Sequence, residues 1–110
     1  MTLPVRVSVR AAHDADVIFN WLAERSHEGA IRWYETFLTM LRTLPDSALG
    51  CPIAHEGGEL GIDLRELLFK TRKGHFYRVL FIVRADAVHV LNVRGPGQDD
   101  VTPADLGVPD

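Results

Sequence analysis

One segment of the sequence restricts the fold more than any other, because large apolar side chains occupy consecutive positions in it: residues 75–83, HFYRVLFIV. Successive side chains of a β-strand point to opposite faces of the sheet, so such a strand is stable only when both faces are covered. We therefore expect residues 75–83 to form a central strand with packed layers on both sides.

The neighbouring segments predict the rest of a sheet. Residues 62–69 and 88–93 are rich in apolar side chains, and short turns at 71–74 and 84–87 separate them from the central strand. Three strands joined by short turns form an antiparallel meander. Near the N-terminus, valine alternates with polar residues over positions 5–10, which predicts one further, half-buried strand.

Two amphipathic helices are predicted between the first strand and the meander. Apolar residues recur every three or four positions over 15–22 and 30–44, after a cap at Asp14 and before a break at Pro45. The short connection at 26–29 makes the two helices an antiparallel hairpin. We expect the two tryptophans of this hairpin to face the core: Trp21 and Trp33.

The resulting fold class is α+β, with the element order β-αα-βββ in a single domain over residues 1–110. Residues 45–61 are interrupted by proline and glycine, which predicts a loop, and residues 95–110 are expected to form a loop and a short tail. Three acidic residues in or just after residues 45–61 are expected to be solvated: Glu56, Glu59 and Asp63.

Composition narrows the class of protein. A chain of 110 residues with 46% hydrophobic and 25% charged residues is typical of one small globular domain. No apolar stretch is long enough for a membrane span, and the N-terminus has no signal-peptide pattern, so we expect a cytoplasmic protein without a membrane partner. A single cysteine, Cys51, with only His55 nearby predicts no disulfide, no metal site and no cofactor.

Charge is distributed unevenly along the chain. Residues 64–94 contain seven basic and two acidic residues, a net charge of +5, whereas the whole chain has −3, which leaves −8 for the remainder. Such polarity favours a negatively charged partner for the meander. The alternative interpretation is that exposed strand positions simply carry solvated arginine and lysine.

Four basic residues of the meander are candidates for chemistry: Arg65, Arg78, Arg94 and His89. Arginines on three consecutive strands can hold phosphates if the strand register brings them to one face. With His89 or Lys70 as proton acceptor, they would suit RNA cleavage without a metal ion. The alternative is that Arg78 is structural and pairs with an acid such as Glu66.

The order and spacing of four segments resemble the RelE/ParE toxin superfamily of bacterial type II toxin–antitoxin modules, often described as plasmid stabilisation proteins: LRTLP at 41–45, LREL at 64–67, YRVLF at 77–81 and VLNVR at 90–94. The resemblance extends from about Val5 to Asp100. It implies a two-helix hairpin packed on an antiparallel sheet, and a toxin that inhibits growth until a cognate antitoxin neutralises it.

The resemblance leaves two targets. One branch of the family cleaves mRNA on the ribosome as a metal-free endoribonuclease, and the matching positions here are Arg65, Arg78 and Arg94. The other branch poisons DNA gyrase. Residues 95–100 read GPGQDD where many relatives have further His and Arg, no tyrosine follows Tyr77, and the chain is acidic. These departures favour the gyrase branch or a catalytically inactive relative, and whether the chain is an enzyme stays open.

Two surfaces are predicted to bind the antitoxin. One is an apolar groove on the hairpin, formed by Trp33, Phe37 and Met40, and the other is the basic stretch with Lys70, Arg72 and Lys73. An unpaired sheet edge would also accept a strand from the partner. The non-toxic alternatives are an antitoxin-binding relative and an interaction domain that dimerises through the hairpin, so a homodimer or a hetero-oligomer with antitoxin is possible.

Overall fold

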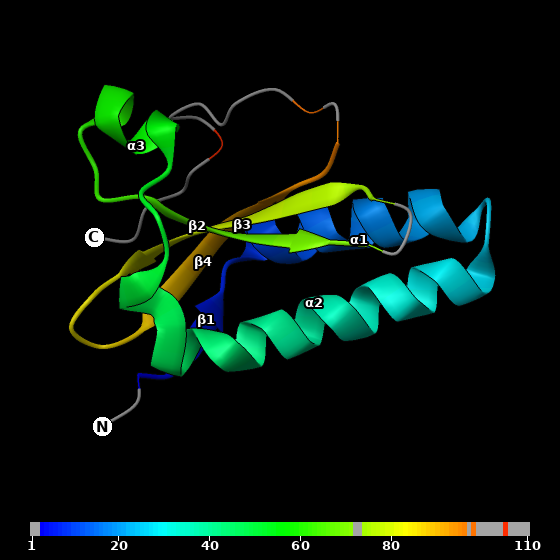
Figure 1. The fold of residues 1–110 in the computed structure, drawn as a ribbon, viewed down its shortest axis with the longest axis horizontal. Coiled ribbons are helices and arrows are strands. Elements are labelled where there is room, and N and C mark those ends of the chain that lie inside the picture. The colour runs from blue at the N-terminus through cyan, green and yellow to red at the C-terminus, as the bar shows by residue number, and fades with distance from the viewer. Residues whose placement is uncertain (1–2, 72–73, 97, 99–104, 106–110) are drawn as a thin grey trace.

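The computed structural model describes residues 3–71, 74–96, 98 and 105, which form an α+β fold in the expected order (Figure 1). In chain order the elements are β1 (Val5–Val7), α1 (Val9–Ala23), α2 (His27–Ser47), a short 3-10 helix η1 (Ala48–Gly50), α3 (His55–Leu60), β2 (Arg65–Lys70), β3 (Phe76–Val83) and β4 (Val88–Arg94). No described helix is both long and apolar enough to cross a membrane.

The four strands form one sheet in the order β1-β4-β3-β2. Both contacts within the meander are antiparallel, as predicted, with Arg78 facing Leu68 on β2 and Arg94 on β4. The first strand is parallel to β4, with Val5 opposite Val88, so the sheet is mixed. Strands β2 and β4 run in the same direction because β3 reverses the chain between them, and β1 shares that direction.

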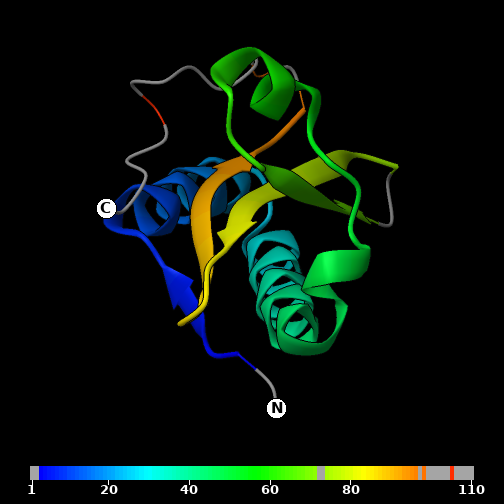
Figure 2. The ribbon, with the colours of Figure 1, turned by 90° about the vertical axis from the view of Figure 1, so that its left-hand side faces the viewer.

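The central strand β3 is covered on both faces, as its sequence requires. Helices α1 and α2 lie on one face of the sheet and α3 lies on the other (Figure 2). Tyr77, Val79 and Phe81 pack into the helical layer, whereas Leu80 and Ile82 pack on the side of α3. Consecutive apolar residues of one strand therefore contribute to two separate apolar clusters.

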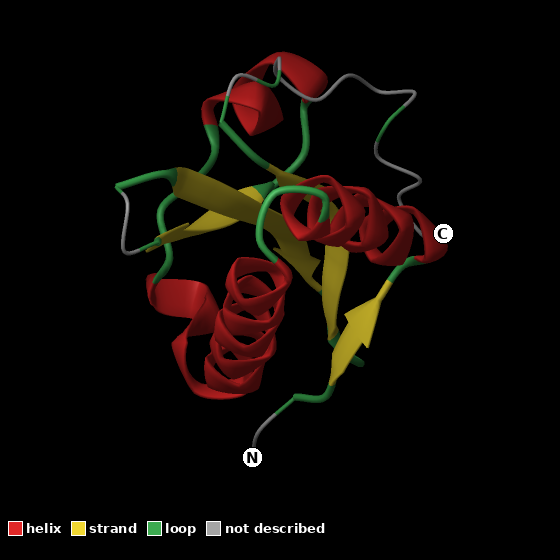
Figure 3. Cartoon of the chain, turned by 90° about the vertical axis from the view of Figure 1, so that its right-hand side faces the viewer, coloured by secondary structure: helices red, strands yellow, loops and turns green. Residues whose placement is uncertain are grey.

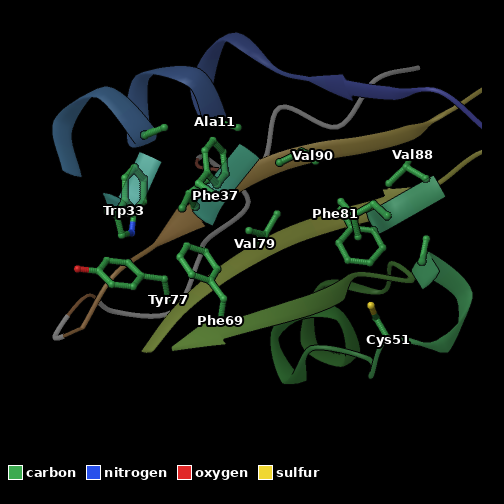
Figure 4. Packing of buried hydrophobic residues seen from close by; sticks show 14 residues of the cluster. Ala11, Trp33, Phe37, Cys51, Phe69, Tyr77, Val79, Phe81, Val88 and Val90 are labelled. Atoms are coloured by element: carbon green, nitrogen blue, oxygen red, sulfur yellow. The ribbon is translucent and has the colours of Figure 1, made fainter. Parts of the chain in front are cut away.

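Aromatic side chains fill the helix-facing core (Figure 4). The rings of Trp33 and Phe37 stack with centroids 5.4 Å apart, and Phe69 and Tyr77 stack at the same separation. Trp33 also contacts Tyr77 at 5.5 Å, which joins the helix pair to the sheet pair. Contacts of this kind add about 0.5–1.5 kcal/mol per pair to the effect of burial alone.

The start of the first helix differs from the prediction. The strand ends at Val7, and α1 begins at Val9 after Ser8, whose Oγ accepts a hydrogen bond from the Ala11 N–H at 3.0 Å. The prediction of Asp14 as the cap is wrong because the helix already begins after Ser8, six residues earlier, where the serine hydroxyl satisfies one of the free N–H groups. Asp14 instead lies inside the helix and accepts a hydrogen bond from the Val93 N–H on β4 at 3.0 Å.

The end of the second helix also differs, because α2 continues through Pro45 to Ser47. The Ala48 N–H still bonds to the Leu44 carbonyl, so the helical hydrogen bonds resume after the proline. A proline near the end of a helix removes one donor without preventing the next turn. Residues 45–61 therefore contain the end of α2, η1 and α3 rather than a continuous loop.

The two tryptophans of the hairpin have different environments. Trp33 is buried as expected, but Trp21 is 53% exposed, with the Arg25 guanidinium 3.6 Å above its ring. The prediction of Trp21 as a core residue is wrong because α1 turns Ala11 and Ala15 toward the core instead.

Candidate functional site

The face of the sheet turned away from α1 and α2 holds the candidate residues Lys70, Arg78 and Arg94. Residues directly opposite one another on neighbouring strands project from the same face. Arg78 on β3 lies directly opposite Leu68 on β2 and Arg94 on β4. Lys70 on β2 lies directly opposite Phe76 on β3. We call these five residues the outer sheet face.

Arg65 does not belong to the outer sheet face. It lies opposite Phe81, whose ring is part of the helix-facing core. Its Nη1 donates to the carbonyl oxygens of Leu49 at 3.1 Å and Cys51 at 2.9 Å, and its Nη2 lies 3.7 Å from the Asp63 carboxylate. The expected gathering of three arginines on one face therefore does not occur, and Arg65 instead holds the segment after α2.

Arg78 is bound to two carboxylates. Its Nη1 and Nη2 donate to the two oxygens of Glu56 at 2.9 and 2.6 Å, and its Nε donates to Glu66 at 2.8 Å. The hydrogen bond to Glu56, followed by that to Glu66, raises the pKa of Arg78 above its already high value, so the guanidinium is always charged. The pairing with Glu66 was the structural alternative for this arginine, and it is present.

Glu56 is the residue that sequence reasoning missed. Its side chain is 1% exposed, although the acidic loop was predicted to be solvated. Glu56 occupies the first turn of α3, where a carboxylate is also favoured by the free N–H groups of the helix. The burial follows from Arg78, because a buried carboxylate requires a hydrogen-bonded cation.

Arg94 is also neutralised. Its Nη2 donates to Asp105 Oδ2 at 2.9 Å, and the other oxygen of Asp105 accepts from Arg10 Nη2 at 3.1 Å. One carboxylate from the C-terminal region therefore bridges an arginine of β4 and an arginine of α1.

His89 lies apart from the arginines. It faces Ile82 on β3, four residues from Arg78, which corresponds to roughly 13 Å along the strand. Its Nε2 is 3.3 Å from Asp86 Oδ1, and this hydrogen bond lowers the pKa of Asp86. A proton acceptor at His89 is thus too far from Arg78 to share one scissile phosphate with it.

The exposed part of the outer sheet face is an apolar and cationic strip: Leu68, Lys70 and Phe76. Phe76 is 54% exposed, and Lys70 Nζ lies 5.4 Å from the centre of its ring. A solvent-exposed aromatic ring beside a lysine and an exposed leucine is suited to contact with another macromolecule. Arg72 and Lys73, which were predicted to bind the antitoxin together with Lys70, lie outside the described residues.

The predicted apolar groove on the hairpin is not present. Trp33 and Phe37 are each 3% exposed, and Met40 packs against the same core. Trp33 and Phe37 are therefore part of the core and offer almost no surface to a partner, and Met40 is partly buried against them. The reason is the orientation of α2 on the sheet, which turns Trp33 into contact with the rings of Phe69 and Tyr77.

Cys51 is buried beneath η1, with its Sγ 3.5 Å from the Ser47 carbonyl oxygen. Burial raises the pKa of this thiol, which makes it a poor nucleophile at neutral pH. Within the described part of the chain, no three His, Cys, Asp or Glu side chains are grouped closely enough to hold a metal ion.

No protein-family model matches the chain, and no characterised protein sequence matches it.

Proposed function

We propose that the chain is the toxin-type component of a type II toxin–antitoxin pair and that it acts by binding a protein rather than by cleaving RNA. The order of the elements, a strand, a helical hairpin and a three-stranded meander, agrees with the fold that the sequence resemblance implies. The resemblance supports the class of protein, and the geometry of the outer sheet face supports the mode of action.

One observation carries the second part of the proposal: both arginines on the outer sheet face are already paired with carboxylates. A phosphate would have to displace Glu56, which binds Arg78 through two hydrogen bonds and is itself buried. It would also have to displace Asp105 from Arg94. Stabilisation of a phosphoryl transition state requires cations that are available to the reacting group, so this arrangement favours binding over catalysis.

The same face supports an antitoxin of acidic and partly apolar character. Lys70 and the basic stretch around it attract negative charge, and Leu68 and Phe76 provide apolar area. Strand β2 is an end strand of the sheet, and among the described residues the backbone of 52–54 pairs with its outer edge at Leu64–Glu66. An extended acidic segment would extend the sheet along Leu68–Lys70, with backbone hydrogen bonds for affinity and charge for specificity.

The test is induced expression in a bacterial host, with and without the small gene beside it. We expect growth arrest that the adjacent gene relieves, inhibition of gyrase supercoiling by the purified chain, and intact mRNA on ribosomes. Cleavage of ribosome-bound mRNA would contradict the proposed mode of action. Normal growth despite soluble expression would contradict the toxin itself and favour the antitoxin-binding or dimerising interaction domain.

A further inference from the structure

Asp105 joins two arginines that belong to different layers of the fold. Its Oδ2 accepts a hydrogen bond from Arg94 Nη2 on β4 at 2.9 Å, and its Oδ1 accepts one from Arg10 Nη2 on α1 at 3.1 Å. Each oxygen of this carboxylate therefore holds one guanidinium. We call Arg10 and Arg94 the arginine pair.

The start of α1 is fixed against β4, which brings the arginine pair together. Strand β1 leads directly into α1 (Figure 3), and the Ser8 N–H between them donates to the Val90 carbonyl oxygen at 3.0 Å. Ser8 Oγ donates to the next carbonyl oxygen of β4, that of Leu91, at 3.1 Å. Arg10 lies in the first turn of α1 and Arg94 is the last residue of β4. The backbone positions of both arginines are thus set by contacts that do not involve Asp105.

The surroundings of the arginine pair favour an anion. Arg94 lies directly opposite Arg78 on β3, and like charges opposite one another on neighbouring strands destabilise a sheet. Arg10 lies at the N-terminal end of a helix of 15 residues that has no acidic residue in its first turn. The free N–H groups at that end of a helix also attract negative charge. Asp105 is the anion that the structure places there.

Asp105 does not use every donor of the arginine pair. Arg94 Nε is buried and has no hydrogen-bond partner among the described residues, and Asp105 accepts only from Nη2 of this arginine. An arginine binds a carboxylate most strongly when two of its nitrogens donate to the two oxygens at once, as Arg78 does with Glu56. A carboxylate that replaced Asp105 and approached Arg94 from the side of Nε and Nη2 would gain this second hydrogen bond.

We propose that the arginine pair is a binding site for a carboxylate of an acidic peptide segment in a partner protein, and that Asp105 occupies this site in the free chain as an internal competitor. The side chain of Arg10 is 48% exposed and that of Asp105 is 23% exposed, so the site is accessible from solvent. A carboxylate replaces Asp105 charge for charge, whereas a phosphate dianion would add negative charge near the two carboxylates bound to Arg78. The proposal does not depend on the toxin assignment, because it concerns binding to the isolated chain.

The test is the affinity of the purified full chain for a labelled peptide of alternating aspartate and alanine, measured by fluorescence anisotropy at low salt. Asp105→Asn removes the charge of the internal competitor and should tighten binding roughly three- to tenfold, because occupation of a site by a competitor lowers its apparent affinity in proportion. Asp46→Asn is the matched control, since it makes the same change of charge at an exposed aspartate on α2, which does not carry the arginine pair. This control should bind the peptide as the parent chain does.

A second substitution tests whether the gain depends on the arginine pair. Arg94→Gln in the Asp105→Asn chain should remove the gain, and Arg10→Gln, at the more exposed position, should remove most of it. Thermal unfolding checks that each variant is folded. An affinity of Asp105→Asn equal to that of Asp46→Asn would overturn the proposal, and so would a gain that survives both arginine substitutions.

A phosphopeptide distinguishes the two classes of anion. The gain from Asp105→Asn should be at least as large for the acidic peptide as for a peptide of the same length with phosphoserine in place of aspartate. A larger gain for the phosphopeptide would overturn the assignment of the site to a carboxylate.

Discussion

Arg78 donates from both Nη atoms to the carboxylate of Glu56, at 2.9 and 2.6 Å, across the boundary between the sheet and α3. This pair holds the six-residue helix α3 against the sheet, together with the packing of Leu60 in the apolar cluster that contains Leu80 and Ile82. The guanidinium fits the carboxylate in the paired geometry that gives arginine its specificity for such groups. Arg78 therefore connects β2, β3 and α3 through one side chain.

Removal of Arg78 should destabilise the fold. Arg78→Ala removes the guanidinium that donates two hydrogen bonds to the buried carboxylate of Glu56 and one to Glu66, and we expect the free energy of unfolding to fall by about 3 kcal/mol. Thermal and denaturant unfolding measure the loss. Arg42→Ala, which removes an exposed arginine from α2, serves as the control and should change stability by less than about 0.5 kcal/mol. Equal stability of the two variants would show that the carboxylate pair contributes nothing to the fold.

The hydrogen bond from β4 to α1 should contribute as well. Asp14 Oδ2 accepts from the Val93 N–H at 3.0 Å and from Asn92 Nδ2 at 3.3 Å, and Asn92 is buried. Asp14→Ala leaves both donors unsatisfied and should cost about 1 to 3 kcal/mol. Asp16→Ala on the exposed side of the same helix is the matched control. A loss of the same size in both variants would point to helix propensity rather than to the contact with β4.

The sheet could be predicted from the sequence because the pattern that indicates it lies within a few consecutive residues. The apolar run at 75–83 requires two covering layers whatever those layers are, and the turns beside it fix the antiparallel partners. The N-terminal cap of α1 was harder to predict, because serine and aspartate are both common cap residues. In the structure Ser8 is the cap, and Asp14 instead accepts a hydrogen bond from the Val93 N–H. The end of α2 was mispredicted at Pro45 for a related reason. Packing of α2 against the sheet outweighs the loss of one backbone N–H donor at the proline.

The site was less predictable than the fold. Which face each arginine occupies depends on the register, and a shift by one residue exchanges the faces, so the sequence could not decide whether Arg65 and Arg78 share a face. The register puts them on opposite faces. Glu56 gave no sequence signal, because its burial depends on a cation 22 residues away. Trp21 and Trp33 both belong to a series of apolar residues spaced three or four positions apart, so the sequence pattern does not distinguish them. Their different exposure comes from the side that each helix turns toward the sheet.

Cys51 predicts how stability depends on alkaline pH. Burial raises the pKa of the native thiol, so as the pH rises through the ordinary range of a thiol, about 8.5, the unfolded chain releases a proton that the native chain retains. The unfolded state then binds fewer protons, and the free energy of unfolding should fall as the pH rises through this range. Denaturant unfolding at several pH values measures the slope, and Cys51→Ala should reduce it. A slope that is the same in both proteins would assign the effect to another group.

The last prediction concerns the binding of the antitoxin to the outer sheet face. Lys70 is exposed above the ring of Phe76, and the stretch 64–94 carries a net charge of +5. Because electrostatic attraction raises association rates and salt screens it, the on-rate of an acidic antitoxin should fall several-fold between low and physiological salt. Charge reversal at Lys70, Arg72 and Lys73 should remove most of this dependence, whereas Phe76→Ala should act mainly on the dissociation rate because it removes apolar contact area.

Arg42→Glu is the control for this experiment, because Arg42 is exposed on the helical side of the molecule and its reversal changes the net charge without changing the outer sheet face. The control should keep the salt dependence of the parent chain. If the on-rate is independent of salt and indifferent to the triple reversal, the basic stretch is only a solvated surface. The antitoxin would then have to bind elsewhere, and Trp33 and Phe37 would not provide that surface because both are buried.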